Sequence, residues 1–329
     1  MSISVVIATY NRASLLEATL DQLIRQAYEP GDEVIVVDNG STDATPQVVA
    51  RAAQEFPVHL RSMHEARNGK GSALNTGIGA AHGSIVALTD DDVLVADDWI
   101  PTIREIFTDP SIALVGGRVD PNWERPAPTW LRIERDGHYT RMASPLALQN
   151  YGPSAQPLGE RTAIGANMVV RRTVCEHVGG ISTQLAPQSG TLIRAEDHEF
   201  CVRVRAAGYR CEYHPQLKVK HWVPVSRTNF GYFLRWFFWS GVAHAILGSD
   251  DPVGDNGTRR AIPYYFAQNL LRTSLTAVYE WAKGSRAKAA AAATEAAFAL
   301  GYVAQCKARW SLPRPKRKRR PTAPASSAG

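Results

Sequence analysis

A short apolar run that leads into three consecutive aspartates constrains the fold of this chain more than any other feature. Residues 85–88 follow Gly83 and read Ile-Val-Ala-Leu, which is typical of a buried strand in a parallel sheet. Asp90, Asp91 and Asp92 come almost directly after it. Side chains two residues apart on an extended chain point the same way, so Asp90 and Asp92 should share a face. Two carboxylates at the end of such a strand predict a hard divalent cation, Mg²⁺ or Mn²⁺, that carries substrate phosphates.

The alternative is that one of these aspartates caps the next helix while the others are solvated. Asp97 and Asp98 are better placed to cap it, because they lie just before residues 99–101, where apolar residues begin to recur at helical spacing. The stretch 90–92 therefore favours a ligand role over a capping role.

Strand and helix patterns alternate at short intervals through the first 118 residues. Strands are expected at residues 3–8, 33–37, 58–63, 85–88 and 112–115. Ser14 and Glu17 have the spacing of a capping box for the first helix. The alternation predicts an α/β fold with a mostly parallel sheet, right-handed crossovers and helices on both faces. Polar clusters follow these strands and should converge at one edge of the sheet; they lie at residues 9–12, 38–43, 67–72 and 90–92.

The second half of the chain is less regular. Residues 120–161 carry six prolines and four Trp or Tyr residues, which indicates either an acceptor-side wall or a packed surface loop. A strand is expected again at residues 164–171 and a helix at 195–205. Glu196 and Asp197 fall in the first turn of that helix, where two acids can simply complement the helix dipole.

The C-terminal third is rich in aromatic residues and ends in a basic tail. Residues 230–239 are densely aromatic, but Arg235 and His244 interrupt the apolar run, so we do not expect it to span a membrane. We favour interfacial contact with a membrane over a helical cap that buries these aromatic side chains on the rest of the protein. Six cations within residues 314–320 strengthen that preference, because each is attracted to anionic lipid.

Charge and cysteine usage exclude some classes of protein. The formal net charge is +6, and the basic tail accounts for it, so the remainder is close to neutral and a nucleic-acid partner is not expected. The cysteines show no paired spacing, which predicts free thiols in a reducing compartment rather than structural zinc; they are Cys175, Cys201, Cys211 and Cys306. The chain starts with a strand pattern rather than an export signal, which predicts a cytoplasmic location.

Taken together, these motifs resemble the family 2 glycosyltransferases with the GT-A fold. The resemblance covers roughly residues 3–222 and rests on an ordered series of segments: residues 4–12, 36–43, 68–71 with 75–77, 90–92, and Glu196-Asp197 followed by Arg203. It implies a GT-A catalytic domain over residues 1–222, with a nucleotide-binding half at 1–118 and an acceptor-binding half at 119–222. A helical region at 223–311 and a disordered basic tail at 312–329 complete the expected organisation.

The resemblance also implies a role for individual residues. A nucleotide-sugar donor would be bound by Thr9, Tyr10, Asn11, Arg12, Asp38, Asn68, Lys70, Asp90 and Asp91. Asp90, Asp92 and His221 would hold the divalent metal, and Asp197, with Glu196 beside it, would be the catalytic base. These roles replace the interpretations that position alone favours, namely dipole complements at 196–197 and a structural histidine at 221.

The implied activity is the inverting transfer of a sugar from a nucleotide-diphosphate sugar, UDP-linked by family frequency, to a hydroxyl of a glycan or lipid-linked acceptor. We expect this step to belong to cell-surface or extracellular polysaccharide biosynthesis, at the inner face of the membrane. Tyr232 stands where processive members carry Gln before Arg235-Trp236, which favours a single addition. A nucleotidyltransferase that makes the activated sugar and a non-catalytic nucleotide-sugar binder remain as alternatives. The chain lacks the glycine-rich N-terminal phosphate loop that a nucleotidyltransferase would need. A non-catalytic binder would not need a base such as Asp197.

Overall fold

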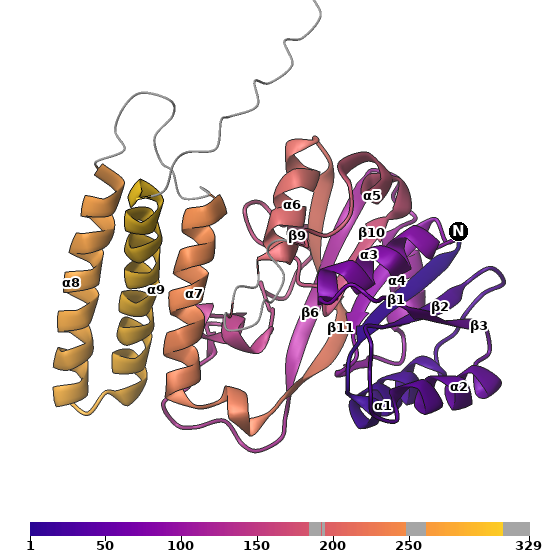
Figure 1. The fold of residues 1–329 in the computed structure, drawn as a ribbon, viewed down its shortest axis with the longest axis horizontal. Helices are drawn as coiled ribbons and strands as arrows, with labels where there is room; N and C mark the ends of the chain where they lie inside the picture. The colour runs from indigo at the N-terminus through magenta and orange to yellow at the C-terminus, as the bar shows by residue number, and fades with distance from the viewer. Residues whose placement is uncertain (184–191, 193–194, 248–260, 312–329) are drawn as a thin grey trace, which may run out of the picture.

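The structure is a computed structural model that describes residues 1–183, 192, 195–247 and 261–311. A twisted sheet with helices on both sides forms the larger part of the molecule, and a layer of long helices stands beside it (Figure 1). The segments at 184–191, at 193–194 and at 312–329, including the basic tail, lie outside the described residues.

Within the described residues, nine strands form one mixed sheet in the order β3-β2-β1-β4-β10-β6-β11-β5, with β9 paired to β11. Their bounds are β1 (Ile3–Thr9), β2 (Glu33–Asp38), β3 (His59–His64), β4 (Ile85–Asp90), β5 (Val93–Val95), β6 (Ile112–Trp123), β9 (Gln156–Pro157), β10 (Asn167–Arg171) and β11 (Arg210–Val223). The strands β1 to β4 are parallel, as predicted. However, β10 runs antiparallel between β4 and β6, so a strand from the second half completes the centre of the sheet.

Helices cover both faces because successive strand residues point to opposite sides. In β1, Ile3, Val5 and Ile7 enter the core beneath α1, α2 and α4, whereas Val6 enters the core beneath α3, α5 and α6. The bounds of these helices are α1 (Ala13–Leu23), α2 (Thr45–Glu55), α3 (Lys70–Ala80), α4 (Trp99–Ile106), α5 (Arg172–Val178) and α6 (Glu196–Ala206). The predicted two-sided α/β architecture is confirmed.

The capping box predicted for the first helix is wrong. Ser14 and Glu17 make no capping contact, because α1 already begins at Ala13 and the Ala13 amide donates a hydrogen bond of 3.0 Å to Asp43 Oδ2. Glu17 instead forms an ion pair with Arg51 of α2. The start of α1 is therefore fixed by the loop after β2, a contact between distant parts of the chain.

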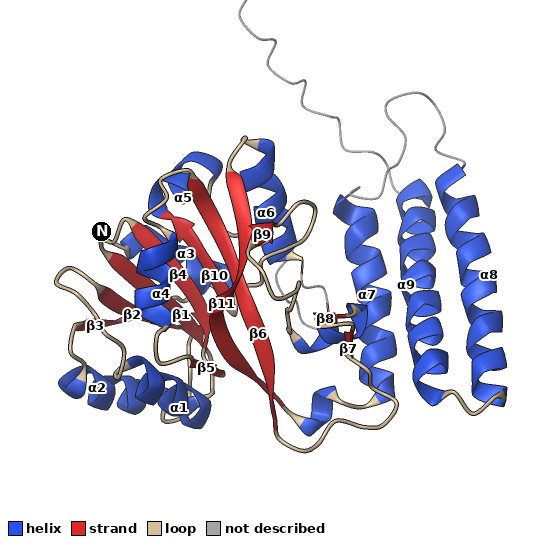
Figure 2. Cartoon of the chain, turned by 180° about the vertical axis from the view of Figure 1, so that it is seen from behind, coloured by secondary structure: helices blue, strands red, loops and turns tan. Residues whose placement is uncertain are grey.

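The second half is more regular than its sequence suggested. The strand patterns at 210–213 and 217–222 form one continuous strand, β11, whose register with β6 shifts between His214 and Lys218. Both strands run on from the sheet toward the helical layer (Figure 2). The expected excursion at 120–161 begins inside β6 and then contains the hairpin β7 (Glu134–Arg135) and β8 (His138–Tyr139), the 3-10 helix η1 (Arg141–Leu146) and β9.

The described C-terminal residues form the long helices α7 (Phe230–Leu247), α8 (Ala261–Ala282) and α9 (Arg286–Ser311). α7 lies against the sheet and its helices, residues 1–222, which we call the catalytic part because the resemblance implies that role. α9 lies next to α7, and α8 is outermost (Figure 1). Phe233 and Phe237 of α7 are buried, and Phe233 meets Trp130 edge-on with ring centroids 5.1 Å apart. The aromatic run of α7 is therefore a packed cap on the catalytic part. No helix among the described residues is both long enough and apolar enough to cross a membrane.

Two glycines bring α7 and α9 into close contact. A Cβ atom added at Gly241 of α7 would lie 2.0 Å from the Phe298 carbonyl oxygen, and one at Gly301 of α9 would lie 1.9 Å from that of Phe238. Only glycine fits at both places, because any side chain would force the two backbones apart. The position of α7 against the catalytic part is thus tied to that of α9.

Candidate active site

A cavity of about 930 Å³ lies where the carboxyl ends of β1 and β4 face α6, η1 and α7. Most of the predicted site residues line it, namely Thr9, Tyr10, Arg12, Asn68, Lys70, Asp90, Asp91, Asp92, Glu196, Asp197 and His221. Asn11 and Asp38 are absent from its lining and instead shape the neighbouring loop. Asn11 Oδ1 accepts from the Thr42 amide at 2.7 Å, and Asp38 Oδ1 accepts from the Ser41 amide at 2.8 Å.

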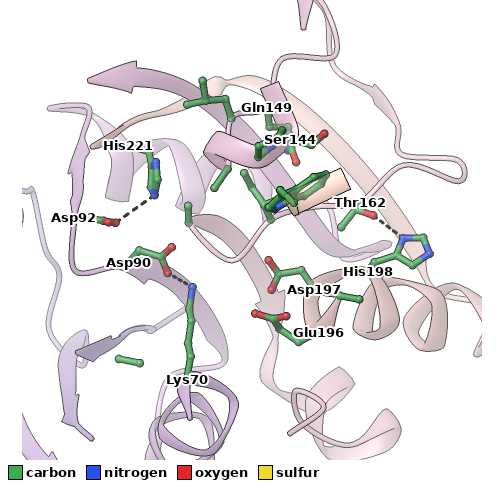
Figure 3. A pocket seen from close by; sticks show the side chains of 18 of the residues that line it. Lys70, Asp90, Asp92, Ser144, Gln149, Thr162, Glu196, Asp197, His198 and His221 are labelled. Atoms are coloured by element: carbon green, nitrogen blue, oxygen red, sulfur yellow. Dashed lines mark hydrogen bonds and ion pairs between the residues drawn. The ribbon is translucent and has the colours of Figure 1, made fainter. Parts of the chain in front are cut away.

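Asp90, Asp92 and His221 form a compact group on one side of this cavity (Figure 3). One ligand atom from each lies within 4.8 Å of the others. Asp90 ends β4, and Asp92 follows in the turn before β5. The Trp222 amide of β11 donates to the Asp92 carbonyl at 2.9 Å and so brings His221 beside Asp92.

Two atoms in this group are buried without a hydrogen-bond partner among the described residues, Asp92 Oδ1 and His221 Nδ1. His221 Nε2 lies 3.4 Å from Asp92 Oδ1. Burial lowers the pKa of His221, against the opposing charges of Asp92 and Asp90, so its ring is neutral and has a lone pair to offer. Two carboxylates and a neutral imidazole fit a Mn²⁺ or Mg²⁺ ion, and the orphaned Asp92 Oδ1, which faces His221 Nε2, is an atom that such an ion would satisfy.

Arg12 fixes the orientation of the acidic turn. Its Nη1 donates to Asp91 Oδ1 at 2.9 Å and to Asp92 Oδ2 at 2.7 Å. Burial disfavours the guanidinium charge, but Asp91 and Asp92 outweigh it and raise the pKa of Arg12. Because Arg12 occupies Oδ2 of Asp92, the other oxygen is turned toward His221.

Lys70 is a partly buried cation between the two acidic groups. It starts α3 directly after Gly69, whose φ of +120° favours glycine, and its ammonium group pairs with Asp90 (Figure 3). Burial disfavours its charge, but Asp90, Asp197 and Glu196 together raise the pKa of Lys70. The cavity therefore holds a permanent positive charge beside Asp90.

Asn39 was not predicted as a site residue, yet it holds the loop that presents Asn68 and Lys70. Its Nδ2 donates to the carbonyls of Glu65 and Arg67 at 2.7 and 2.8 Å, and its Oδ1 accepts from the Gly69 amide at 2.7 Å. A polar side chain directly after a buried strand was the available signal in the sequence.

Glu196 and Asp197 face the cavity from the side opposite the Asp90 group (Figure 3). They start α6, and Asp197 Oδ2 accepts a hydrogen bond of 2.8 Å from the Gly165 amide. Further along α6, Arg203 donates to the carbonyls of residues 178–180 and pairs with Glu199 at 2.6 Å. Arg203 thereby anchors the helix that carries the two acids.

A wall formed by α7 and η1 also lines the cavity; α7 was not predicted there, whereas η1 lies within residues 120–161, for which an acceptor-side wall was one of two interpretations. α7 contributes Trp236, Phe237, Ser240, Ala243 and His244, and η1 contributes Arg141, Ser144 and Pro145. The His244 ring stacks on the His198 ring of α6, with centroids 5.9 Å apart, and His198 Nδ1 lies 2.8 Å from Thr162 Oγ1. The signal in the sequence was the spacing of four residues between Trp236, Ser240 and His244, which places them on one face of a helix.

Comparisons with known proteins agree with this geometry. The family described as glycosyl transferase family 2 matches residues 4–179. A glucosyl-dolichyl phosphate glucuronosyltransferase of Haloferax volcanii is 28% identical over 256 residues, which cover 75% of this chain and 77% of the relative. The O-antigen chain rhamnosyltransferase RfbN of Salmonella typhimurium is 28% identical over 261 residues, 74% of this chain and 73% of the relative.

Solved structures support the fold. The mannosyltransferase PcManGT from Pyrobaculum calidifontis, in complex with GDP-Man and Mn²⁺, aligns with a TM-score of 0.57 at 23% identity, covering 93% of this chain and 74% of that one. At this identity the likeness concerns the fold alone, which is that of the GT-A enzymes. Because the family match covers more than half of its length, the chain belongs to glycosyl transferase family 2 and is a glycosyltransferase with the GT-A fold.

Proposed function

We propose that this enzyme transfers one sugar, with inversion at the anomeric carbon, from a UDP-sugar to a hydroxyl of a glycan or lipid-linked acceptor in cell-surface polysaccharide biosynthesis. The observation that carries the proposal is the arrangement of acids across one cavity: Asp90, Asp92 and His221 on one side, and Asp197 with Glu196 on the other. UDP is proposed on its frequency in the family; one GT-A structure contains GDP-Man and another, GalNAc-T7, contains UDP.

The donor nucleotide would lie along Thr9, Tyr10 and Arg12, with its diphosphate toward Asp90. A metal held by Asp90, Asp92 and His221 would supply Lewis-acid stabilisation of the charge that develops on the leaving diphosphate. Lys70 adds a fixed positive charge beside the same oxygens. These groups are preorganised, because Arg12 and the Trp222 amide already hold the acidic turn in place.

Asp197 would take the proton from the acceptor hydroxyl as that oxygen attacks the anomeric carbon. The Gly165 amide orients its carboxylate, and Arg203 anchors the helix beneath it. The acceptor would enter between α6 and α7, where Trp236 offers an aromatic face, and Ser240 and His244 offer polar atoms. One base on the face opposite the leaving group supports a single in-line displacement, and therefore inversion.

Two relatives support the class of acceptor, because their names give a glucosyl-dolichyl phosphate and an O-antigen chain as what they act on. We accordingly propose peripheral contact with the cytoplasmic face of a membrane, assisted by the cations at 314–320.

The direct test is Asp197→Asn. We expect kcat for sugar transfer to fall by about 10²–10⁴-fold, because the amide cannot accept the proton, while the Kd for the nucleotide sugar changes little. Turnover with a panel of nucleotide sugars and Mn²⁺ measures the first, and isothermal titration measures the second. Asp21→Asn, an exposed change on α1, is the matched control.

Normal turnover by the Asp197→Asn variant would show that the base is assigned wrongly. The same panel separates the alternatives. Release of pyrophosphate from a nucleoside triphosphate and a sugar phosphate would indicate a nucleotidyltransferase, and binding without turnover in the unmodified protein would indicate a non-catalytic partner.

A further inference from the structure

The outermost helix, α8, exposes its large apolar side chains. Leu271, Leu275, Val278 and Trp281 are 64%, 62%, 66% and 72% exposed. Leu271, Leu275 and Val278 recur at intervals of four and three residues, so they form one stripe on the helix. Tyr279, which is 55% exposed, borders the stripe. We call these five residues the α8 face.

The opposite side of α8, toward α9, carries smaller and more polar residues. The partly buried residues on this side include Asn269, Thr273, Ser274 and Ala277. The Thr273 hydroxyl donates a hydrogen bond of 2.7 Å to the Asn269 carbonyl. Phe266 and Leu270 are the large exceptions: Phe266 stacks on Tyr302 of α9 with ring centroids 3.9 Å apart, and Leu270 is partly buried against the core. A helix folded for water buries its large apolar residues, so α8 has the reverse arrangement over most of its length. Small residues between helices and large ones outside are typical of a surface turned toward lipid.

The charges around the α8 face are almost all positive. Arg272 lies on α8 itself, and Lys283, Arg286 and Lys288 are exposed at the turn into α9. The acid of the described part of α8, Glu280, is partly buried. Lys283 lies over the Tyr279 ring, with Nζ 4.3 Å from the centroid. Two copies of so basic a face would repel each other, whereas an anionic surface complements it.

Aromatic residues point to the same occupant. Trp281 and Tyr279 have an apolar ring with a polar edge, which suits the headgroup region of a bilayer. We therefore propose that α8 lies flat on an anionic lipid surface, with the α8 face inserted among the headgroups and the nearby cations against the phosphates. The inference rests on the membrane-side function proposed above and adds to it the surface that docks. α7 cannot serve in this way, since its aromatic residues are used in packing.

The experiment is flotation of the full chain with two kinds of vesicle, phosphatidylcholine alone and phosphatidylcholine mixed equally with phosphatidylglycerol. We expect binding to the mixed vesicles, and a fall of about tenfold or more in the partition coefficient for Leu275→Gln with Val278→Gln. Both side chains are exposed, so the folded state should tolerate the change. The matched control, Val202→Gln with Val225→Gln, alters two exposed valines outside α8 and should bind as the unmodified protein does.

Equal flotation of the α8 variant and the unmodified protein would overturn the proposal, as would failure of the unmodified protein to bind the mixed vesicles. A dimer in sedimentation equilibrium that the α8 variant dissociates would also overturn it, because the occupant would then be a second copy. Donor hydrolysis without vesicles should be unchanged in the α8 variant, and Asp197→Asn should float normally. Failure of docking and failure of the proposed chemistry are therefore observed separately.

Discussion

At the scale of single residues, the site depends on side chains that hold one another in place. Arg12 occupies one oxygen of Asp92, and the Trp222 amide brings His221 beside the other. The geometry of the proposed metal site, formed by Asp90, Asp92 and His221, therefore exists before any ligand binds. The group is most sensitive to the loss of His221, because no other described residue takes its place beside Asp92.

Replacing His221 tests this group. We expect His221→Ala to weaken Mn²⁺ binding about tenfold or more, because an imidazole is lost from a buried set of three ligands. Titration of Mn²⁺ in the presence of UDP measures the affinity, and His59→Ala, at an exposed position of β3, is the control. Identical Mn²⁺ affinity in both variants would remove His221 from the proposed ligand set.

Glu33, far from the cavity, gives a pH dependence to stability. Burial by itself raises the pKa of Glu33, but hydrogen bonds from the His82 amide, the Ser4 hydroxyl and the Arg61 guanidinium outweigh it and lower the pKa below its usual value. A carboxylate with a lowered pKa stabilises the fold above its unfolded pKa, and that contribution disappears as the pH falls through the folded value.

We therefore expect Glu33→Gln to lower the unfolding free energy at pH 7 by about 1–3 kcal/mol. Between pH 6 and pH 3, the unfolding free energy of the variant should fall by less than that of the unmodified protein. Urea unfolding at a series of pH values measures both. Parallel pH profiles for the two proteins would show that Glu33 does not contribute in this way.

Asp90 and Asp92 could be predicted from local pattern, because they follow a buried strand and strand ends lie at the edge of the sheet. Asp197 could be predicted only from the family resemblance, because its position in the first turn of a helix favours a dipole complement. The contacts of Asn39 and His198 could not be predicted, because they depend on partners that only folding brings near: the loop at 65–69 for Asn39, and His244 of α7 for His198. For Asn39 the sequence indicated only its place in the polar cluster 38–43 after a buried strand.

At the scale of elements, strand and helix positions followed from periodicity, but strand order did not. The first strands are parallel because helices connect them, which the alternation shows directly. The antiparallel insertion of β10 between β4 and β6 depends on pairing across 50 residues or more, as in Val169 opposite Val115 and Ala87. The shift of register inside β11 is likewise set by its partner β6.

The contact between α7 and α9 gives a prediction at this scale. Gly301→Ala places a methyl group against the Phe238 carbonyl, so we expect the unfolding free energy to fall by about 1–3 kcal/mol. Gly79→Ala is the control: it lies within α3 with open space around it, and should be neutral or slightly stabilising. Chemical denaturation measures the unfolding free energy of both variants. Equal values for the two variants would mean that α7 and α9 can move apart without loss of unfolding free energy.

At the scale of the whole molecule, the division into a sheet domain and a helical region stays a prediction, and the two parts share one cavity. The cavity takes its donor side from β1, β4 and α3, and its far wall from α7. The domain boundary predicted at residue 222 falls at the end of β11, one residue after His221. One continuous strand thus links the proposed metal group to the chain that leads into α7.

The family match ends at residue 179, whereas α7 begins at Phe230. The residues at the ends of β1 and β4 that line the cavity thus lie within the family match, whereas the wall that α7 contributes lies beyond it. Transplanting the segment 230–311 from a relative into this scaffold would be a compact way to retarget it. We expect such a hybrid to keep its nucleotide preference and to change its acceptor, because the proposed acceptor entry lies between α6 and α7.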